Sequence, residues 1–386
     1  MFGDQISSIA LPLVAVLALH ASAAQMGLLT ALVWTPSLLF AVHAGAWVDR
    51  RAHRRATMIV ADLGRAGLLA SVPASYALGV LTIWQLYAVA FGAGTFSVLF
   101  TVGNPALFVA LVPADRYMDG NTLVYGSRAL SFVGGPSVGG LLVQLVTAPF
   151  AVLADALSFL GSAFFLSRIR PAEAPPATAE DGALSVGAKF IRDSPVVRSS
   201  LIAISLVNFF NFVFLALFVL YATRSLHVRP GLLGLVLGAG AVGGVLGALV
   251  TKRLAARLGV GRVNTAAFLV FTAPLVLVPL ASGTKPVILA LLFAAEFVSG
   301  LGLMALDISA ASIYAVVIPN ELRSRVNGAF QAVNYGVRPL GALAGGFLAT
   351  AIGVRPTLWL ATVGATIGFF LLLPSPVPKF RFEGPS

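Results

Sequence analysis

The chain has 386 residues, of which 58% are hydrophobic and 10% charged, and its formal net charge is +11. A soluble domain draws about a quarter of its residues from Asp, Glu, Lys and Arg, so this composition excludes an ordinary soluble fold. The chain lacks cysteine, and its four histidines lie far apart. Disulfides, cysteine nucleophiles and thiolate metal sites are therefore excluded, and we expect no metal and no other cofactor.

Crossing a hydrocarbon core of about 30 Å takes roughly 20 apolar residues in a helix. By this measure the chain contains twelve predicted membrane-spanning helices. In chain order they are 2–19, 26–48, 57–78, 82–111, 119–146, 150–167, 197–223, 232–251, 263–282, 286–317, 326–352 and 356–373. The first segment leads directly into the others, so we interpret it as a spanning helix and not as a cleavable signal peptide.

One long polar stretch separates the first six segments from the last six. Residues 171–182 have almost nothing apolar to bury, which predicts disorder, and 183–193 form an amphipathic pattern typical of a helix on the inner membrane surface. The predicted fold class is an all-α membrane protein with two pseudo-symmetric six-helix bundles. The predicted domains are a first bundle at 1–168, a linker at 169–195, a second bundle at 196–374 and a cytoplasmic tail at 375–386.

The distribution of cations predicts the orientation. With a cytoplasmic N-terminus, 18 of the 25 Lys and Arg residues fall in inside loops and four fall outside. The outside four are Arg224, Arg229, Lys285 and Arg355. Cytoplasmic loops of membrane proteins carry an excess of Lys and Arg, so both termini are predicted to be cytoplasmic. The basic clusters also lack the continuous face that nucleic acid requires.

The two halves match at a nearly constant offset of 206 residues. The loop at 112–115 corresponds to that at 318–321, and Asn121 corresponds to Asn327. The matched glycines are Gly135, Gly139 and Gly140 with Gly341, Gly345 and Gly346. Repeated halves around a central path are the architecture of alternating access, with substrate held near the midplane.

A short motif after the second predicted helix has the residues of a cytoplasmic gate. Gly45 permits close helix packing, and Asp49 stands beside Arg50, Arg54 and Arg55. The alternative is that these cations only fix the topology. The pattern resembles the loop between helices two and three of the major facilitator superfamily, a resemblance that implies an ion-pair latch.

The fifth predicted helix contains Gly135, Pro136, Gly139 and Gly140. Proline bends a helix and the glycines allow tight packing, so the motif suits a pivot, a seal against ion leak or ordinary helix packing. It resembles the Gly-Pro-x-x-Gly-Gly motif of superfamily exporters.

Further segments resemble one exporter branch, which includes enterobactin exporters and macrolide-efflux-like proteins. They lie at 2–5, 62–65, 323–328 and 338–346. The resemblance covers nearly the whole chain and implies substrate–proton antiport. The fourth predicted helix lacks the arginine that many drug–proton antiporters have. Because the Gly-Asp pair of this branch lies well inside helix one, we expect the natural protein to begin some ten to twenty residues before Met1.

Ionisable residues inside a membrane usually face the bundle interior, because a mid-bilayer charge costs at least about 2.5 kcal/mol. Proton coupling needs a carboxyl group without a fixed cation partner. Our candidates are Asp4, Glu296 and Asp307. Alternatively, Arg338 pairs with Glu296 or Asp307 on the tenth predicted helix, and that acid then has a structural role. The charges interpreted as structural are Asp62, Arg65, Arg128, Asp155 and Arg338, with Asp62 and Arg65 at the i,i+3 spacing of an ion pair.

Polar and aromatic residues in the spans are candidates for a substrate cavity. They are Asn208, Asn211, Phe212, Trp34 and Tyr335. The alternative is that the aromatics face lipid or pack between helices. The substrate is expected to be a small amphipathic molecule of the drug, macrolide or siderophore class.

Other functional classes fit less well. Neither a zinc motif nor a paired-aspartate motif supports an intramembrane enzyme, and the Gly-x-Gly-x-x-Gly match at 238–243 follows no strand and indicates helix packing. We therefore expect a monomeric, non-enzymatic exporter in a bacterial inner membrane, with protons, lipid and a small substrate as its partners and no nucleic acid. A non-transporting receptor or assembly scaffold is the alternative.

Overall fold

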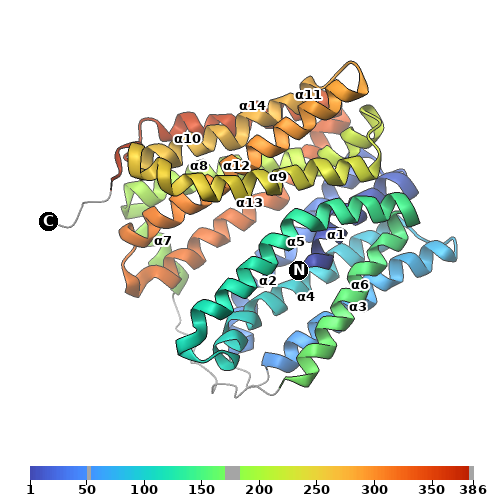
Figure 1. The fold of residues 1–386 in the computed structure, drawn as a ribbon, viewed down its shortest axis with the longest axis horizontal. Helices are drawn as coiled ribbons and strands as arrows, with labels where there is room; N and C mark the ends of the chain where they lie inside the picture. Colours follow the sequence, from blue (N-terminus) through green and yellow to red (C-terminus); the bar gives the residue numbers. More distant parts are fainter. Residues whose placement is uncertain (50–53, 170–182, 382–386) are drawn as a thin grey trace. The chain divides into compact units, whose positions relative to one another are not determined.

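The computed structural model describes residues 1–49, 54–169 and 183–381, and within these ranges every regular element is a helix (Figure 1). The predicted all-α class is confirmed. Contacts divide the chain into two compact units. The first is Met1–Asp181 with Val228–Leu235, and the second is Gly182–His227 with Val236–Ser386. The domain bounds predicted from the sequence assign residues 228–235 to the second bundle. These domain bounds stay a prediction.

The helices of the first unit are α1 (Phe2–Leu13), continued by a π-helical turn at Val14–Ala18, α2 (Ala23–Asp49), α3 (Arg54–Ala77), α4 (Ile83–Leu111), α5 (Tyr117–Val146) and α6 (Ala148–Arg168). The second unit contains α7 (Ala183–Asp193), α8 (Pro195–Leu220) with a π-helical turn at Tyr221–Ser225, α10 (Val260–Thr272), α11 (Leu277–Leu280), α12 (Lys285–Val317), α13 (Arg323–Ile352) and α14 (Val354–Leu372). Helix α9 (Pro230–Leu258) begins in the first unit and continues in the second.

Each of the twelve predicted segments coincides with helical structure, with ends that differ by a few residues. The segment 263–282 differs most, because a 3-10 turn at Ala273–Val276 separates α10 from α11. Pro274 in that turn has no N–H to donate, which ends α10. Among the described residues, nine helices are long and apolar enough to cross a membrane. Since Phe2–Ala18 is shorter and α3 and α13 carry several charges, twelve crossings stay a prediction.

Local chemistry explains several helix ends. The Thr82 side chain accepts a hydrogen bond from the N–H of Gln85 at 3.3 Å and caps α4. Gly259 joins α9 to α10 and Gly353 joins α13 to α14, with φ angles of 90° and 92°. This left-handed region favours glycine, so both residues stop one helix and start the next.

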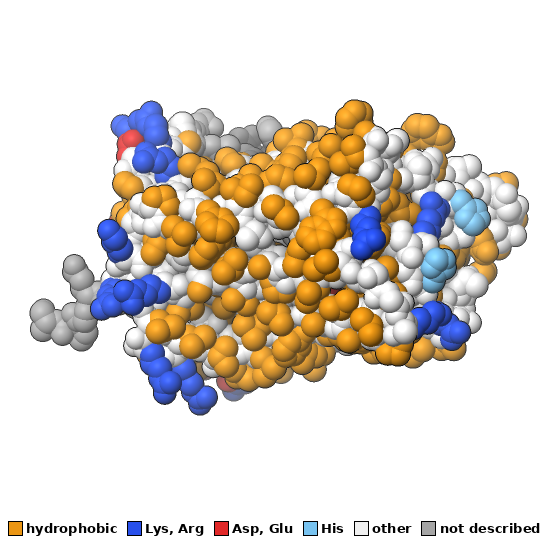
Figure 2. Space-filling model, turned by 90° about the horizontal axis from the view of Figure 1, so that it is seen from above, with side chains coloured by type: hydrophobic (Ala, Val, Ile, Leu, Met, Phe, Trp, Pro, Cys, Tyr) orange, Lys and Arg blue, Asp and Glu red, His pale blue; other side chains and the backbone are white. Residues whose placement is uncertain are grey.

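The surface is rich in large apolar side chains. Trp84, Leu130 and Phe347 are exposed by 73%, 74% and 74%. On the face that Figure 2 shows, hydrophobic side chains cover the middle, and Lys and Arg side chains gather towards the ends. Exposed apolar surface of this extent is unfavourable in water and suits a lipid surrounding.

Helix α7 has the bounds that the amphipathic pattern predicted. Its apolar face contacts protein: Ile191 is buried in a cluster with Val197, Ile318 and Val326. Gly187 lies against the backbone carbonyl of Arg325, where a Cβ would not fit. Helix α7 is therefore fixed to α13 within the second unit. Its position on the membrane surface stays a prediction, and the segment 171–182 lies outside the described residues.

Candidate functional site

Glycines hold α1 closely against α5. A Cβ on Gly135 would overlap the Gln5 side chain, and a Cβ on Gly139 would lie 3.0 Å from the Cα of Ile6. The helix-five motif therefore permits the α1–α5 contact. Helix α1 also packs along α6. These contacts fix the position of Asp4 within the first unit.

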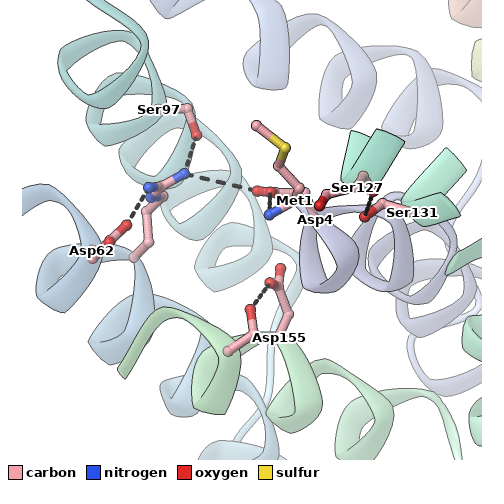
Figure 3. Close-up of polar contacts among 9 residues, drawn as sticks. Met1, Asp4, Asp62, Ser97, Ser127, Ser131 and Asp155 are labelled. Atoms are coloured by element: carbon pink, nitrogen blue, oxygen red, sulfur yellow. Dashed lines mark hydrogen bonds and ion pairs between the residues drawn. The ribbon is translucent and has the colours of Figure 1, made fainter. Parts of the chain in front are cut away.

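Arg65 is the centre of an ion network in the first unit, and three of its partners, Asp62, Asp4 and Ser97, are labelled in Figure 3. Its guanidinium donates to the carboxylate of Asp62, one turn away on α3. It also lies 3.8 Å from the carboxylate of Asp4 on α1 and donates to the Ser97 hydroxyl on α4 at 3.4 Å. Asp62 is 0% and Arg65 5% exposed. The expectation that Asp4 lacks a cation partner is wrong, because the Arg65 guanidinium lies within ion-pair distance of its carboxylate.

Aromatic rings enclose the Arg65 guanidinium on two sides. Its carbon lies 4.0 Å from the ring centre of Phe159 on α6 and 4.7 Å from that of Phe100 on α4. A cation is stabilised over an aromatic face, more strongly where water is excluded. The first unit thus holds one arginine by both ion pairs and rings, and three helices beside α3 contribute to it.

Asp155 lies apart from this arginine. It is 1% exposed on α6 and accepts a hydrogen bond from the Ser158 hydroxyl at 3.1 Å. Its carboxylate faces Gly3 of α1, where a Cβ would overlap it. Arg128, the other cation predicted within the spans of this unit, is exposed on α5.

The second unit groups polar residues of α8 and α13. The Asn208 amide donates to the Asn334 carbonyl oxygen at 2.7 Å. The Arg338 guanidinium carbon lies 4.4 Å from the ring centre of Tyr335 and 5.3 Å from that of Phe212. The structure therefore brings three of the predicted substrate residues into one group around Arg338 and Asn334.

The other candidate substrate residues are placed differently. Asn211 is half-buried on α8, and Trp34 is half-buried on α2 in the first unit. Phe212 is only 4% exposed, so it supports Arg338 and presents little surface of its own. Sequence reasoning missed Asn334, although an asparagine beside Tyr335 in an apolar span was a signal that could have identified it.

The two acids of α12 have different surroundings. Asp307 is exposed and interacts electrostatically with Arg338. Glu296 is half-buried, and its carboxylate lies 3.4 Å from the position of a Cβ on Gly240 of α9. Within the part of the chain that the structure describes, Glu296 makes no ion pair. The suggested structural role of Arg338 therefore applies to Asp307 and not to Glu296.

The predicted gate lies mostly beyond the described side chains. Arg50 is outside the described residues, and the surroundings of Gly45, Asp49 and Arg54 are not described. Arg55 donates to the backbone carbonyls of Ile169 at 2.6 Å and Ser167 at 3.3 Å. It thus caps the C-terminal end of α6, where carbonyls lack helical partners.

The last glycine of the helix-five motif contacts the start of α9. A Cβ on Gly140 would overlap the Pro230 carbonyl, and one on Gly234 would overlap the Pro136 carbonyl. The Gln144 side chain also accepts a hydrogen bond from the Gly231 N–H at 3.2 Å. The motif therefore packs α5 against α1 and against the first residues of α9.

Comparisons with known proteins agree with this architecture. The family model described as Major Facilitator Superfamily matches residues 1–335 and, in a second match, 201–385. The chain is 30% identical over 376 residues to the multidrug efflux pump Tap of Mycobacterium tuberculosis, covering 92% of this chain and 85% of Tap. It is 26% identical over 366 residues to the MFS-type transporter YfiS of Bacillus subtilis, covering 91% and 84%.

Two solved structures share the fold. A bacterial homologue of the iron transporter ferroportin in its inward-facing state has a TM-score of 0.75 at 17% identity, covering 97% of this chain and 95% of that one. The nucleoside transporter NupG has a TM-score of 0.71 at 12% identity, with coverage of 98% and 100%. The protein is a multi-pass helical membrane transporter. The chain belongs to the Major Facilitator Superfamily.

Proposed function

We propose that this transporter exports small amphipathic molecules of the drug, macrolide or siderophore class in exchange for protons. The observation that carries the proposal is the 30% identity to a multidrug efflux pump over 92% of the chain. We place the transporter in a bacterial inner membrane as a monomer, with both termini cytoplasmic and two six-helix bundles that alternate access.

The substrate contacts that we propose lie on α8 and α13, with Trp34 on α2 as a further contact. Asn208 and Asn334 offer amide groups to a polar substituent, and Tyr335 offers a ring and a hydroxyl. Phe212 is proposed as the support of Arg338. Amides beside rings suit a ligand with an apolar body and a few polar groups.

Asp4, Glu296 and Asp307 remain the proposed proton-coupling acids. Glu296 has the strongest support, because it lies in an apolar span without an ion pair among the described residues. Asp307 and Asp4 each have an arginine nearby, so a proton on either acid would weaken that attraction. The gate residues Gly45, Asp49, Arg50 and Arg54 keep their proposed role, while Arg55 has support as a helix cap.

Inverted membrane vesicles test the proposal, with ethidium as an amphipathic probe. Energised vesicles that contain the protein should accumulate ethidium, and a proton uncoupler should abolish the accumulation. Replacing the coupling acid by its amide should abolish accumulation and leave downhill ethidium exchange intact. Wild-type vesicles that neither accumulate nor exchange ethidium, a macrolide or a siderophore would support the receptor or scaffold function instead.

A further inference from the structure

Asp155 is a buried carboxyl that no cation neutralises in the described part of the first unit. It is 1% exposed, and its one hydrogen bond with good geometry comes from Ser158 on its own helix. The absence of a side chain at Gly3 lets α1 approach this carboxylate directly. A buried carboxylate without a cation partner is costly, so this position calls for an explanation beyond packing.

The charged groups on the neighbouring helices leave Asp155 uncompensated. From α1, Asp4 acts electrostatically on it, and Asp4 itself lies 3.8 Å from Arg65. From α3, Asp62 and Arg65 are paired with each other. The acidic and basic residues of α5 are Asp119 and Arg128, and both side chains are exposed, whereas Asp155 is buried. Asp4 follows Gly3 directly on α1 and is the acid whose charge acts on Asp155, which makes it the candidate for proton exchange.

Ser7 provides an independent observation. It lies one turn after Gly3 on α1 and is 7% exposed, and its hydroxyl faces the Asp155 carboxylate. This hydroxyl makes no hydrogen bond with good geometry to any described residue. A hydroxyl both donates and accepts, so Ser7 can donate to a charged Asp155 and accept from a protonated one.

We infer that Asp155 binds a proton and exchanges it with Asp4 across the contact between α1 and α6. This inference rests on the proposed proton antiport and names a fourth acid for it. One proton moves from the carboxylic acid of one residue to the carboxylate of the other, and no other bond changes. Ser7 and Ser158 hold the Asp155 carboxyl in place, and the bare backbone of Gly3 brings α1 against it.

The full chain in proteoliposomes tests this role, with ethidium as the probe. Wild-type protein and the variants Asp155→Asn, Asp155→Glu and Asp119→Asn are compared. The control Asp119→Asn makes the same chemical change at an exposed position of α5. We expect Asp155→Asn to lose accumulation driven by a pH gradient and to lose ethidium-induced proton release, while exchange at equal pH persists. Asp155→Glu should restore both lost activities.

The outcomes separate the inference from the proposed function. Wild-type accumulation together with normal accumulation in Asp155→Asn overturns the role of Asp155 and leaves proton antiport standing. A wild-type protein that exchanges ethidium but ignores the pH gradient overturns the antiport itself.

A milder variant covers the case in which Asp155→Asn does not fold. Ser7→Ala removes the hydroxyl that faces Asp155 and should shift the pH profile of ethidium accumulation. Ser8→Ala is its control, because Ser8 is exposed and its hydroxyl donates to the Gln5 carbonyl. Identical pH profiles for Ser7→Ala and wild type would overturn the inference.

Discussion

The contact between α1 and α6 in the first unit can be compared with that between α8 and α14 in the second. In the first, Gly3 leaves room for Asp155 and Ser158 of the facing helix. In the second, the Phe210 ring fills the space that Gly364 leaves. Ser158 and Gly364 are 206 residues apart, the offset of the internal repeat. Matching contacts are thus polar in one unit and apolar in the other.

Other contacts of the repeat are the same in both units. A Cβ on Gly139 would lie 3.0 Å from the Cα of Ile6, and a Cβ on Gly345 would lie 3.0 Å from the Cα of Val213. The close approach of α1 to α5 therefore has its counterpart in that of α8 to α13. The two units therefore share their backbone packing and differ in the charges placed around it.

Among the variants that test this difference between the units, Arg65→Ala should have the largest effect on stability. The variant leaves Asp62 buried without its partner, and the free energy of unfolding should fall by about 3 to 5 kcal/mol. Thermal unfolding of the detergent-purified protein, followed by tryptophan fluorescence, measures the change. In the control Arg192→Ala, the lost ion pair with Asp193 is exposed, and the change should stay below about 1 kcal/mol.

A second variant sharpens this result. If Arg65→Ala destabilises the protein because it leaves the Asp62 charge unpaired, removing that charge as well should help. The double variant Asp62→Asn, Arg65→Gln should then lose less free energy of unfolding than Arg65→Ala. An Arg65→Ala protein as stable as wild type would mean that the first unit does not depend on its ion network, and the contrast between the units would then concern packing alone.

The shared packing predicts equal effects in the two units. Gly139→Ala and Gly345→Ala each force a methyl group against a neighbouring backbone, so each should lower the free energy of unfolding by about 1 to 3 kcal/mol. Gly67→Ala on α3 is the control, since nothing lies within 4 Å of its Cβ position, and it should not destabilise. A large loss in only one of the two variants would break the equivalence of the units.

The sequence predicted the helices and indicated that the helix-five glycines permit close packing, because both depend on local patterns. Apolar length determines a span, and small residues at matching positions indicate where two helices meet. The Asp62–Arg65 pair follows from i,i+3 spacing on one helix. These features could be obtained without knowing which helices are neighbours.

The remaining partners could not be obtained this way. Asp4 reaches Arg65 across 61 positions of sequence, and Asn208 reaches Asn334 across 126. The facing of Gly3 and Asp155 likewise depends on how α1 rotates about its axis against α6. Apolar spans have weak periodicity, so their sequence does not fix that rotation. The sequence therefore assigns each of these charged residues to its helix but does not identify its partner on another helix.

Two asparagines of the second unit separate substrate contact from stability. Asn208→Ala should raise the KM for ethidium about fivefold, the equivalent of about 1 kcal/mol for one hydrogen bond, with little change in unfolding temperature. Asn264→Ala is the matched control. It removes a buried hydrogen bond of 3.0 Å to Ser309 and should lower the unfolding temperature with KM unchanged. The opposite pattern would place the substrate contacts away from α8.

The smallest effect concerns Arg55, which the sequence assigned to a gate and the structure shows at the end of α6. If it acts as a cap, Arg55→Ala should lower the free energy of unfolding by about 0.5 kcal/mol, because a cation near the C-terminal carbonyls of a helix is stabilising. The control Arg253→Ala removes an exposed cation of α9 that lies before the last turn, in the second unit, and should change little. A gate role predicts the reverse balance for Arg55→Ala, with unchanged stability and a faster downhill leak of ethidium. Measuring stability and leak in the same two variants therefore decides between a cap and a gate.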